Sequence, residues 1–358
     1  MRRLSAYLLL LPALFATGCF SQLGPRTVPK ARFNYAEALV HSANEQLLAN
    51  LVRLRYRDNP VFLDIGSVVT HFDWEAGASA SASWNGGKPG DRGVGISGSY
   101  AEQPTVTYSP LQGNDFVARL LAPISPANLV LLSQSGWSIE RLMLCCVQKV
   151  NEVRNAMPAA GPTPDFAPSY QDFHHLAQLL RRLQVAGVLE VEVGEKQELV
   201  LHLERAPEGP LGDDAREVRD LLGLPRERAF FRISSSLMQH DSDEIAVAGR
   251  SLLSVLFYLS QAVEVPPEDE EAGRVTVTQN PDGSRFDWLA ATGGLLRVHA
   301  AEKEPSDAAV AVAYRGHWFY IADNDLNSKT TFSLLAYLFQ LKAGNQEVKE
   351  PVLTLGVR

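Results

Sequence analysis

A long stretch of alternating residues, 68–108, constrains the fold more than any other part of the sequence. From Val68 to Trp84 the even positions are mainly apolar or aromatic, and most of the odd positions are charged, Gly or Ser. Period-two alternation over so many residues predicts a long β-strand. A turn-rich sequence at 85–92 and a second alternating run that reaches Tyr100 predict a return strand. We therefore expect 68–108 to form a long amphipathic β-hairpin.

The two faces of this hairpin differ in chemistry. One face is small and apolar and is bounded by the aromatic residues Phe72, Trp74, Trp84 and Tyr100, whereas the other is rich in Gly and Ser. This pattern is typical of membrane β-strands, whose aromatic residues lie at the two interfaces. Soluble antiparallel sheets with one solvated face alternate in the same way. Two interpretations stay open: a hairpin that covers a soluble domain or pairs with another subunit, and a hairpin that enters a membrane.

The composition excludes several classes of protein. The 358 residues are 46% hydrophobic and 21% charged, so the chain can bury a core and is not of the disordered class. The formal charge is −8, and without residues 1–18 it is −10, from 31 basic and 41 acidic residues. An acidic chain without a basic block lacks the charge that binds phosphates, so we expect no nucleic-acid partner. Three cysteines are too few for a disulfide scaffold.

The N-terminus predicts where the protein resides. Arg2 and Arg3 precede an apolar run at 8–15 that is shorter than the roughly 20 residues of a membrane-spanning helix. Residues 1–18 are therefore interpreted as a signal peptide. The segment 16–19, Ala-Thr-Gly-Cys, resembles the lipobox of bacterial lipoproteins, in which the cysteine is acylated, as with palmitate, and becomes the mature N-terminus.

The resemblance to a lipobox implies an anchor and an address. Cys19 would carry the lipid, and residues 19–32, which are polar and hold two prolines, would form a lipidated tether. Phe20 after the cysteine implies sorting to the outer membrane of the cell envelope. We therefore expect a protein that is lipid-anchored in the outer membrane and faces the periplasm, with the membrane itself as a partner through the lipid.

The remaining sequence predicts an α+β fold of mixed helices and short antiparallel strands, because its strands and helices do not alternate as βαβ units. Helical periodicity is found at 35–57, 114–121, 138–154, 169–186, 213–222, 245–263 and 327–341. Short strands are predicted at 188–193, 198–204, 229–234, 274–278, 294–300, 308–314, 317–322 and 352–357.

A proline-rich stretch at 156–168 is the best candidate for a linker. It predicts an N-terminal α+β domain at 33–155, which contains the hairpin 68–108, and a C-terminal α+β domain at 169–358. Asp241 and Glu244 have the spacing of a capping box, which predicts that a helix follows them.

Four stretches of the sequence together resemble a family of Gram-negative envelope lipoproteins. They are NEQLLANLVRLRYRDNPVFLDI (44–65), TYSPLQGNDFVARLLAPISP (107–126), RSLLSVLFYLSQAVEVP (250–266) and YRGHWFYIADNDLNSK (314–329). The resemblance covers most of the mature chain and supports the predicted location. It implies no catalytic residues.

No motif in the sequence predicts catalysis. There is no P-loop, no H-E-x-x-H and no G-x-S-x-G, so we expect no enzyme, no cofactor and no metal site. Asp323 to Asn327 begins like a calcium loop but lacks its glycine and its final glutamate, which favours a helix cap instead. Cys145 and Cys146 are expected to be reduced and buried in a helix, because neighbouring cysteines fit a disulfide badly.

Three functions remain in competition. The first is a non-enzymatic lipoprotein with a structural or assembly role, as a homo-oligomer or with an envelope protein as partner. The second is an oligomeric envelope pore or export component that inserts the hairpin 68–108. The third is a periplasmic binding module that uses polar and aromatic residues of the C-terminal strand–helix junction. Its candidate ligand-binding residues are Arg315, His317, Trp318, Asp323, Asp325 and Lys329.

The predicted lipid anchor is testable by substitution. A fatty-acid probe fed to growing cells should label the protein, and Cys19→Ala should abolish both the label and sedimentation with membranes, because the thiol is the acylated atom. A Cys19→Ala protein that still sediments with membranes would mean that another anchor dominates.

Overall fold

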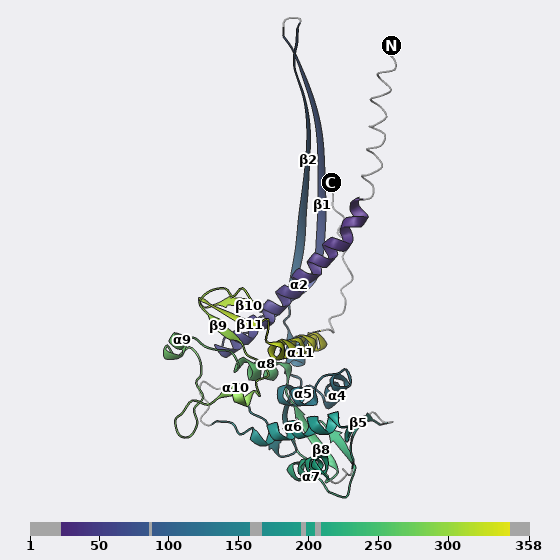
Figure 1. Cartoon of the computed structure of the whole chain (residues 1–358), viewed down its shortest axis with the longest axis vertical. Helices are drawn as coiled ribbons and strands as arrows, with labels where there is room; N and C mark the ends of the chain where they lie inside the picture. The colour runs from purple at the N-terminus through teal and green to yellow at the C-terminus, as the bar shows by residue number, and fades with distance from the viewer. Residues whose placement is uncertain (1–22, 86–87, 158–166, 195–197, 205–208, 344–358) are drawn as a thin grey trace. The chain divides into compact units, whose positions relative to one another are not determined.

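A computed structural model gives the architecture of residues 23–85, 88–157, 167–194, 198–204 and 209–343, with the backbone alone in 23–32 and 64–109 (Figure 1). Helices and short strands in mixed sheets confirm the α+β class. The chain divides into two compact units. One consists of Val61–Phe116, and the other combines residues 23–60 with the described residues from Val117 onward.

The smaller unit is built around a long two-stranded ribbon. β1 (Leu63–Asn85) pairs antiparallel with β2 (Lys88–Pro110), and among the described residues the two strands form a sheet of their own. At about 3.3 Å per residue, each 23-residue strand is roughly 75 Å long. At the open end of the ribbon the rings of Phe62 and Phe116 meet edge to face, with their centroids 5.6 Å apart.

The larger unit contains two sheets. In the six-stranded sheet the order is β4-β3-β8-β7-β6-β5, and only β7 and β8 run parallel. Its strands are β3 (Val147–Val150), β4 (Val153–Arg154), β5 (Leu189–Val193), β6 (Leu199–Leu203), β7 (Phe230–Ser234) and β8 (Glu244–Gly249). The three-stranded sheet has the order β10-β11-β9, and its strands are β9 (His299–Ala301), β10 (Ala308–Tyr314) and β11 (His317–Ala322).

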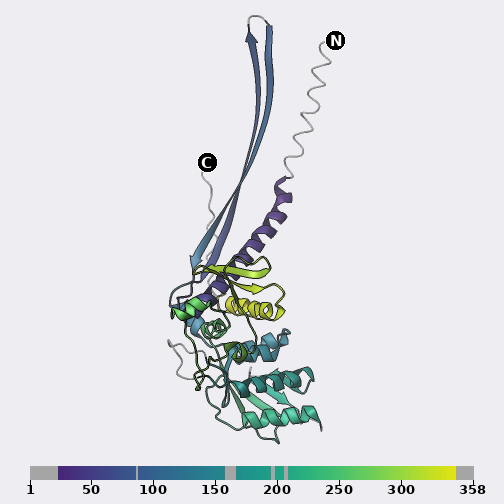
Figure 2. The same ribbon diagram turned by 60° about the vertical axis from the view of Figure 1, so that its left-hand side comes forward.

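Helices cover both sheets of this unit. They are α2 (Leu23–Arg55), α3 (Asn114–Leu121), α4 (Pro126–Gln134), α5 (Ile139–Cys146), α6 (Gln171–Val185), α7 (Pro210–Leu222), α8 (Leu252–Ser260), α9 (Pro267–Glu271), α10 (Trp288–Ala291) and α11 (Leu326–Ala343). α2 packs against α8 and β10, and α6 packs between α5 and α7. Figure 2 shows α11 beside the three-stranded sheet, where Thr331 donates to the carbonyl of Leu295.

The amphipathic pattern of α6 explains its position. Phe173, Leu176, Leu180 and Leu183 recur at helical spacing, and all four are buried. The helix ends where Gly187 adopts a positive φ of 70°, a conformation that glycine reaches without strain. The buried stripe of α6 faces the six-stranded sheet and α5, so this helix forms part of the main core.

A buried arginine joins the elements of the core. The side chain of Arg250 is 1% exposed, and its guanidinium donates to the carbonyls of Leu144 and Cys145 at 2.9 and 3.1 Å. It also donates to the carbonyl of Ala156 and lies over the Tyr258 ring, 3.7 Å from the centroid. None of the ion pairs of the described residues includes Arg250. The charge is instead compensated by the carbonyls at the C-terminal end of α5 and by the aromatic ring.

The predicted helix at 138–154 is only half correct. α5 ends at Cys146, and the chain continues as β3, a turn and β4. Asn151 forms the turn with a φ of 47°, donates to the carbonyl of Leu222 and accepts from the N–H of Ala246. Pairing of β3 with β8 and these buried hydrogen bonds outweigh the helical spacing of the apolar residues.

The helix predicted to begin directly behind Asp241 and Glu244 is also wrong in its first part. The Glu244 carboxylate does accept from the backbone N–H of His240 and of Asp241, at 2.8 and 3.3 Å, but the residues that follow form β8. The helix begins only at α8, where Ser251 accepts from the N–H of Ser254. The capping-box spacing therefore marked a turn into a strand and not a helix start.

Several other boundaries differ from the predictions. α2 begins at Leu23, so part of the predicted tether is helical; Pro25 lies in its first turn, where proline is tolerated. The predicted strand at 274–278 is absent, and of the strand at 294–300 only β9 forms. α4, α9 and α10 were not predicted, and the predicted strand at 352–357 lies outside the described residues.

The chain does not divide at the predicted linker. The six-stranded sheet takes β3 and β4 from before 156–168 and its other four strands from behind it. Because strands from before and behind residues 156–168 are hydrogen-bonded to each other, the segments on both sides of this stretch belong to one unit. The separate unit is the one that contains the ribbon.

Gly249 permits the closest backbone approach in the core. A Cβ at this position would lie 2.1 Å from the carbonyl oxygen of Ile124, and a backbone atom cannot be displaced cheaply. We expect Gly249→Ala to lower the free energy of unfolding by about 2 kcal/mol or more, as overpacked cores do. Gly194→Ala is the matched control, since its Cβ would meet only the flexible end of Glu198. Chemical denaturation of both variants measures the difference, and equal stabilities would contradict the prediction.

Candidate functional site

The six candidate ligand-binding residues do not form one cluster. Arg315, His317 and Trp318 lie at the start of β11, whereas the remaining three follow its end. Asp323 is six residues along the chain from His317, which corresponds to roughly 20 Å of extended strand. Each charged side chain has its own partner within the protein, as described next.

Arg315 is part of a network that holds the end of α2 on the three-stranded sheet. Arg315 and Gly316 both have positive φ and form a two-residue turn between β10 and β11, at the gap between the predicted strands 308–314 and 317–322. The guanidinium of Arg315 donates to Asp58 at 2.8 Å, and the Tyr314 hydroxyl donates to the same carboxylate. These hydrogen bonds, first that of Tyr314 and then that of Arg315, lower the pKa of Asp58.

A buried carboxylate links the same end of α2 to α9. Asp269 is 1% exposed and accepts from the Tyr56 hydroxyl at 2.5 Å and from Arg274. Burial alone would raise the pKa of Asp269, but these two hydrogen bonds outweigh it, so the pKa is lowered. Burial and the bond to Asp269 raise the pKa of Tyr56. His317 is 2.9 Å from Glu268 of α9. The satisfied partners indicate a structural network.

The second group lies at the start of α11. The ammonium of Lys329 is 2.5 Å from Asp323. Asp325 accepts from the backbone N–H of Ser328 at 3.0 Å and from its hydroxyl at 2.6 Å. The carboxylate therefore caps the helix, which confirms the interpretation of this segment as a cap.

The other candidate residues lie either outside the described residues or in the ribbon, where only the backbone is described. Cys19 is outside the described residues. Phe72, Trp74, Trp84 and Tyr100 belong to the ribbon, whose register pairs Trp74 with Tyr100, Phe72 with Glu102 and Trp84 with Pro89. Residues paired directly across two strands share one face.

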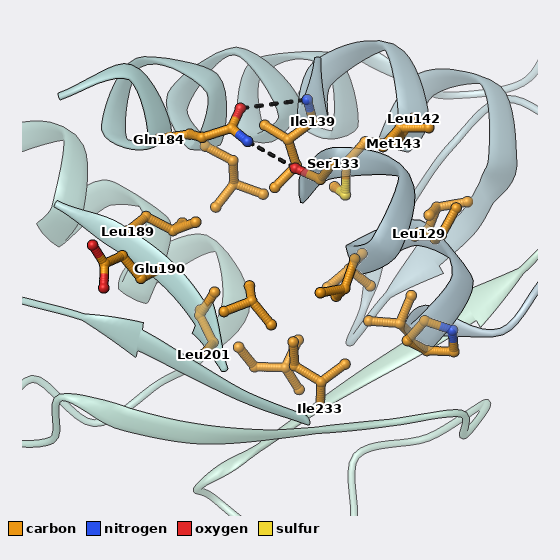
Figure 3. A pocket seen from close by; sticks show the side chains of 18 of the residues that line it. Leu129, Ser133, Ile139, Leu142, Met143, Gln184, Leu189, Glu190, Leu201 and Ile233 are labelled. Carbon is orange, nitrogen blue, oxygen red and sulfur yellow. Dashed lines mark hydrogen bonds between the residues drawn. The ribbon is translucent and has the colours of Figure 1, made fainter. Parts of the chain in front are cut away.

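A cavity of about 370 Å³ lies between the six-stranded sheet and the helices α4, α5 and α6 (Figure 3). Its roof is formed by Leu129 and Val130 of α4, Ile139, Leu142 and Met143 of α5, and Leu180 of α6. Its floor is formed by Val147 and Val150 of β3, Ile245 and Val247 of β8, Ile233 of β7, Leu201 of β6, and Leu189 and Val191 of β5. In Figure 3 Leu189 and Glu190 lie at one end of the cavity and Leu129 at the other.

The floor is a diagonal row across the sheet. Val191 pairs with Leu201, Ile233 pairs with Ile245, and Val247 pairs with Val150. Because the β7 partner of Leu201 is Phe231, the row steps two residues along the strands between β6 and β7, and again within β8. The row crosses five adjacent strands, so four spacings of about 4.8 Å give it a length of roughly 19 Å. The cavity is therefore long and narrow.

The few polar groups of the cavity lie mainly at its edges. Gln184 donates to the hydroxyl of Ser133 at 2.8 Å and accepts from Arg181 and from the N–H of Ile139, so these groups are satisfied (Figure 3). Glu190 and Glu192 of the edge strand are exposed. No basic side chain lines the cavity within the part of the chain that the structure describes.

The cavity is partly open to solvent, and its lining is mainly apolar, so its surface would gain by contact with an apolar ligand. The sequence patterns do not reveal this cavity, because they do not predict α4. The sequence Ser125-Pro126 before the apolar run of α4 is a helix-start signal that was overlooked.

The two neighbouring cysteines are free and completely buried, as predicted. They form the last residues of α5, close to Arg250. A hydrogen bond with Cys145, together with burial, raises the pKa of Cys146 well above its usual value. A thiol that stays protonated is a poor nucleophile, so the geometry favours a packing role.

The described residues contain no group of three or more His, Cys, Asp or Glu side chains arranged to hold a metal ion. None of their helices combines the length and the hydropathy that a membrane crossing requires. No protein-family model, no curated protein and no solved structure matches the chain.

The structural role of the cysteines is testable with thiol reagents. Cys145 and Cys146 should resist a maleimide at pH 8 in the native protein and react after denaturation, because both are buried and Cys146 remains protonated. Cys146→Ala should lower the free energy of unfolding by about 1–2 kcal/mol, less than a Leu→Ala change because fewer atoms are lost. Rapid labelling of the native protein, or a native disulfide in its mass spectrum, would exclude this role.

Proposed function

We propose that this protein is an outer-membrane-anchored periplasmic lipoprotein with a non-enzymatic, structural or assembly role, and that copies of it associate through the β1–β2 ribbon. The observation that carries the proposal is the ribbon itself: two 23-residue strands that pair with no third strand among the described residues.

An isolated two-stranded ribbon is marginally stable in water, because it lacks a third layer against which to bury apolar side chains. Each outer edge also offers a row of backbone N–H and C=O groups to another strand. Natural proteins usually shorten or cover such edges, whereas this ribbon keeps them over roughly 75 Å. A second copy of the same ribbon supplies a partner of equal length, so edge-to-edge association of copies satisfies both edges.

A second candidate function, an oligomeric pore, is favoured by the register of the ribbon. The pairs Ala78–Ile96 and Ala80–Val94 bring the small apolar positions of both strands to one face, and Trp74–Tyr100 adds an aromatic pair at one end. The partners Gly77–Ser97 and Ser79–Gly95 put Gly and Ser on the other face.

The spacing of the aromatic residues fits a bilayer. Trp74 and Trp84 are ten residues apart, or about 33 Å along a strand. At the usual tilt of about 40° this distance corresponds to a height of roughly 25 Å, the height of the apolar band of membrane strands. Phe72 pairs with Glu102 and Ala82 pairs with Arg92, so two charges of β2 share the apolar face. Glu102 lies just outside the segment bounded by Trp74 and Trp84, and Arg92 lies just inside its other end. Ribbons from several copies could then close a ring that leaves no edge unpaired in lipid.

One set of variants tests both proposals. Deletion of 76–98 should reduce the particle to a smaller size, measured by light scattering of the purified protein, because the paired edges are lost. If the ribbon enters a membrane, Ala78→Arg should block dye release from vesicles of bacterial lipids at a cost of about 2–4 kcal/mol per subunit, because the charge would lie in the apolar band. Ser79→Arg, on the opposite face, is the matched control and should be tolerated.

The outcomes separate the two functions. A deletion variant with the particle size of the wild type would eliminate association through the ribbon. Association that depends on the ribbon, combined with no dye release by any variant, would retain the structural role and eliminate the pore.

A further inference from the structure

The geometry of the cavity under α4, α5 and α6 points to a binding site for a single unbranched aliphatic chain whose end group is uncharged. We infer this from the shape, the lining and the charge of the cavity, none of which depends on the ribbon or on the proposed function.

The shape selects a chain over a compact ligand. The floor crosses five strands over roughly 19 Å, so a volume of about 370 Å³ leaves a mean cross-section on the order of 20 Å². Since carbon atoms pack at about 3.5–4.0 Å from one another, this width admits one row of methylene groups. A compact ligand of the same volume would not reach across all five strands.

The lining selects hydrocarbon. Its apolar residues are Leu, Val, Ile, Met and Pro, without any aromatic ring, and the amide and hydroxyl of Gln184 and Ser133 are already paired with each other. An occupant with polar groups along its length would therefore leave them without partners, which disfavours a peptide or a sugar. Methylene groups demand no partner, and each one that is buried contributes to binding.

The charges at the cavity exclude a free acid. No Lys, Arg or His lines the described cavity, and its edge at β5 carries Glu190 and Glu192. The nearby guanidinium of Arg181 does not line the cavity, and it donates to the side-chain oxygen of Gln184 at 2.8 Å. Glu190 and Glu192 alternate with Leu189 and Val191, so their side chains lie on the opposite face of β5. A carboxylate or phosphate at the end of the chain would therefore be buried without a cation to compensate it, whereas an alcohol or an ester carries no charge to compensate.

Binding of n-alcohols to the full mature chain tests the inference. The Cys19→Ala protein is used, so that no acyl group of the chain itself can compete. Octanol, decanol and dodecanol are titrated by calorimetry, and dodecanoate is the charged counterpart of dodecanol. We expect one site per chain and an affinity that rises roughly fourfold per methylene until the chain fills the cavity. Dodecanoate should bind at least tenfold more weakly than dodecanol.

A pair of tryptophan substitutions on one strand localises the site. Val191→Trp should fill the β5 end of the cavity and weaken binding of dodecanol at least tenfold. Val193→Trp is the matched control, since Val193 lies on the same face of β5 but does not line the cavity and is 55% exposed. If Val191→Trp unfolds, Leu201→Phe in the middle of the floor serves as the second blocking variant.

Two results would overturn the inference. One is the absence of any saturable binding of the three alcohols to the wild type. The other is binding that is unchanged in a folded Val191→Trp or Leu201→Phe protein, which would place the alcohols on the surface.

Discussion

The larger unit depends on one buried cation. Removing a charged group from water costs several kcal/mol. For Arg250 this cost is offset by hydrogen bonds to carbonyl oxygens and by contact with an aromatic ring, without a carboxylate partner. Two of these carbonyls, of Leu144 and Cys145, end α5, and a third belongs to Ala156 behind β4. The backbone of Arg250 also bonds to Cys146 and to Ile124. One residue thus fixes a helix end, a sheet edge and the chain before α4 to the same point.

This arrangement explains why α5 stops where it does. A helix leaves its last carbonyls without internal donors, and here the guanidinium supplies the donors. Val147 then pairs with Gly249, and the absence of a side chain at Gly249 lets the strand pass the carbonyl of Ile124. Both cysteines are buried at this point, and their backbone carbonyls accept hydrogen bonds from Arg250. None of these contacts is local in sequence.

The elements that the sequence alone predicts correctly are those whose conformation is decided by neighbouring residues. The stripe of α6, the β5–β6 strands and the turn at Arg315-Gly316 are specified by neighbouring residues, and their prediction was correct. The helix predicted through Val147 and Val150 was wrong, because pairing with β8 decides the conformation there.

The candidate ligand residues at the C-terminal junction were of types that commonly bind ligands. Their partners, among them Asp58 and Glu268, lie far away in the sequence, so their engagement in ion pairs could not be foreseen. The cavity was missed for a related reason: its floor is a row across five strands that only the sheet register brings together.

The ribbon and the cavity have a common physical feature, since each leaves an interaction incomplete. In the ribbon, backbone donors and acceptors line two edges that have no neighbouring strand in the described chain. Because hydrogen bonding is directional, only another strand in register can pair with these groups. In the cavity, the missing interaction is dispersion and the exclusion of water, which is not directional, so the shape and the charge of the lining set the selectivity. A polar, repetitive edge selects a partner of the same kind, and a narrow apolar space selects a chain. Neither property requires a reactive side chain. The polar networks around Asp58, Asp269 and Asp325 likewise hold structural elements together and serve no reaction in this proposal.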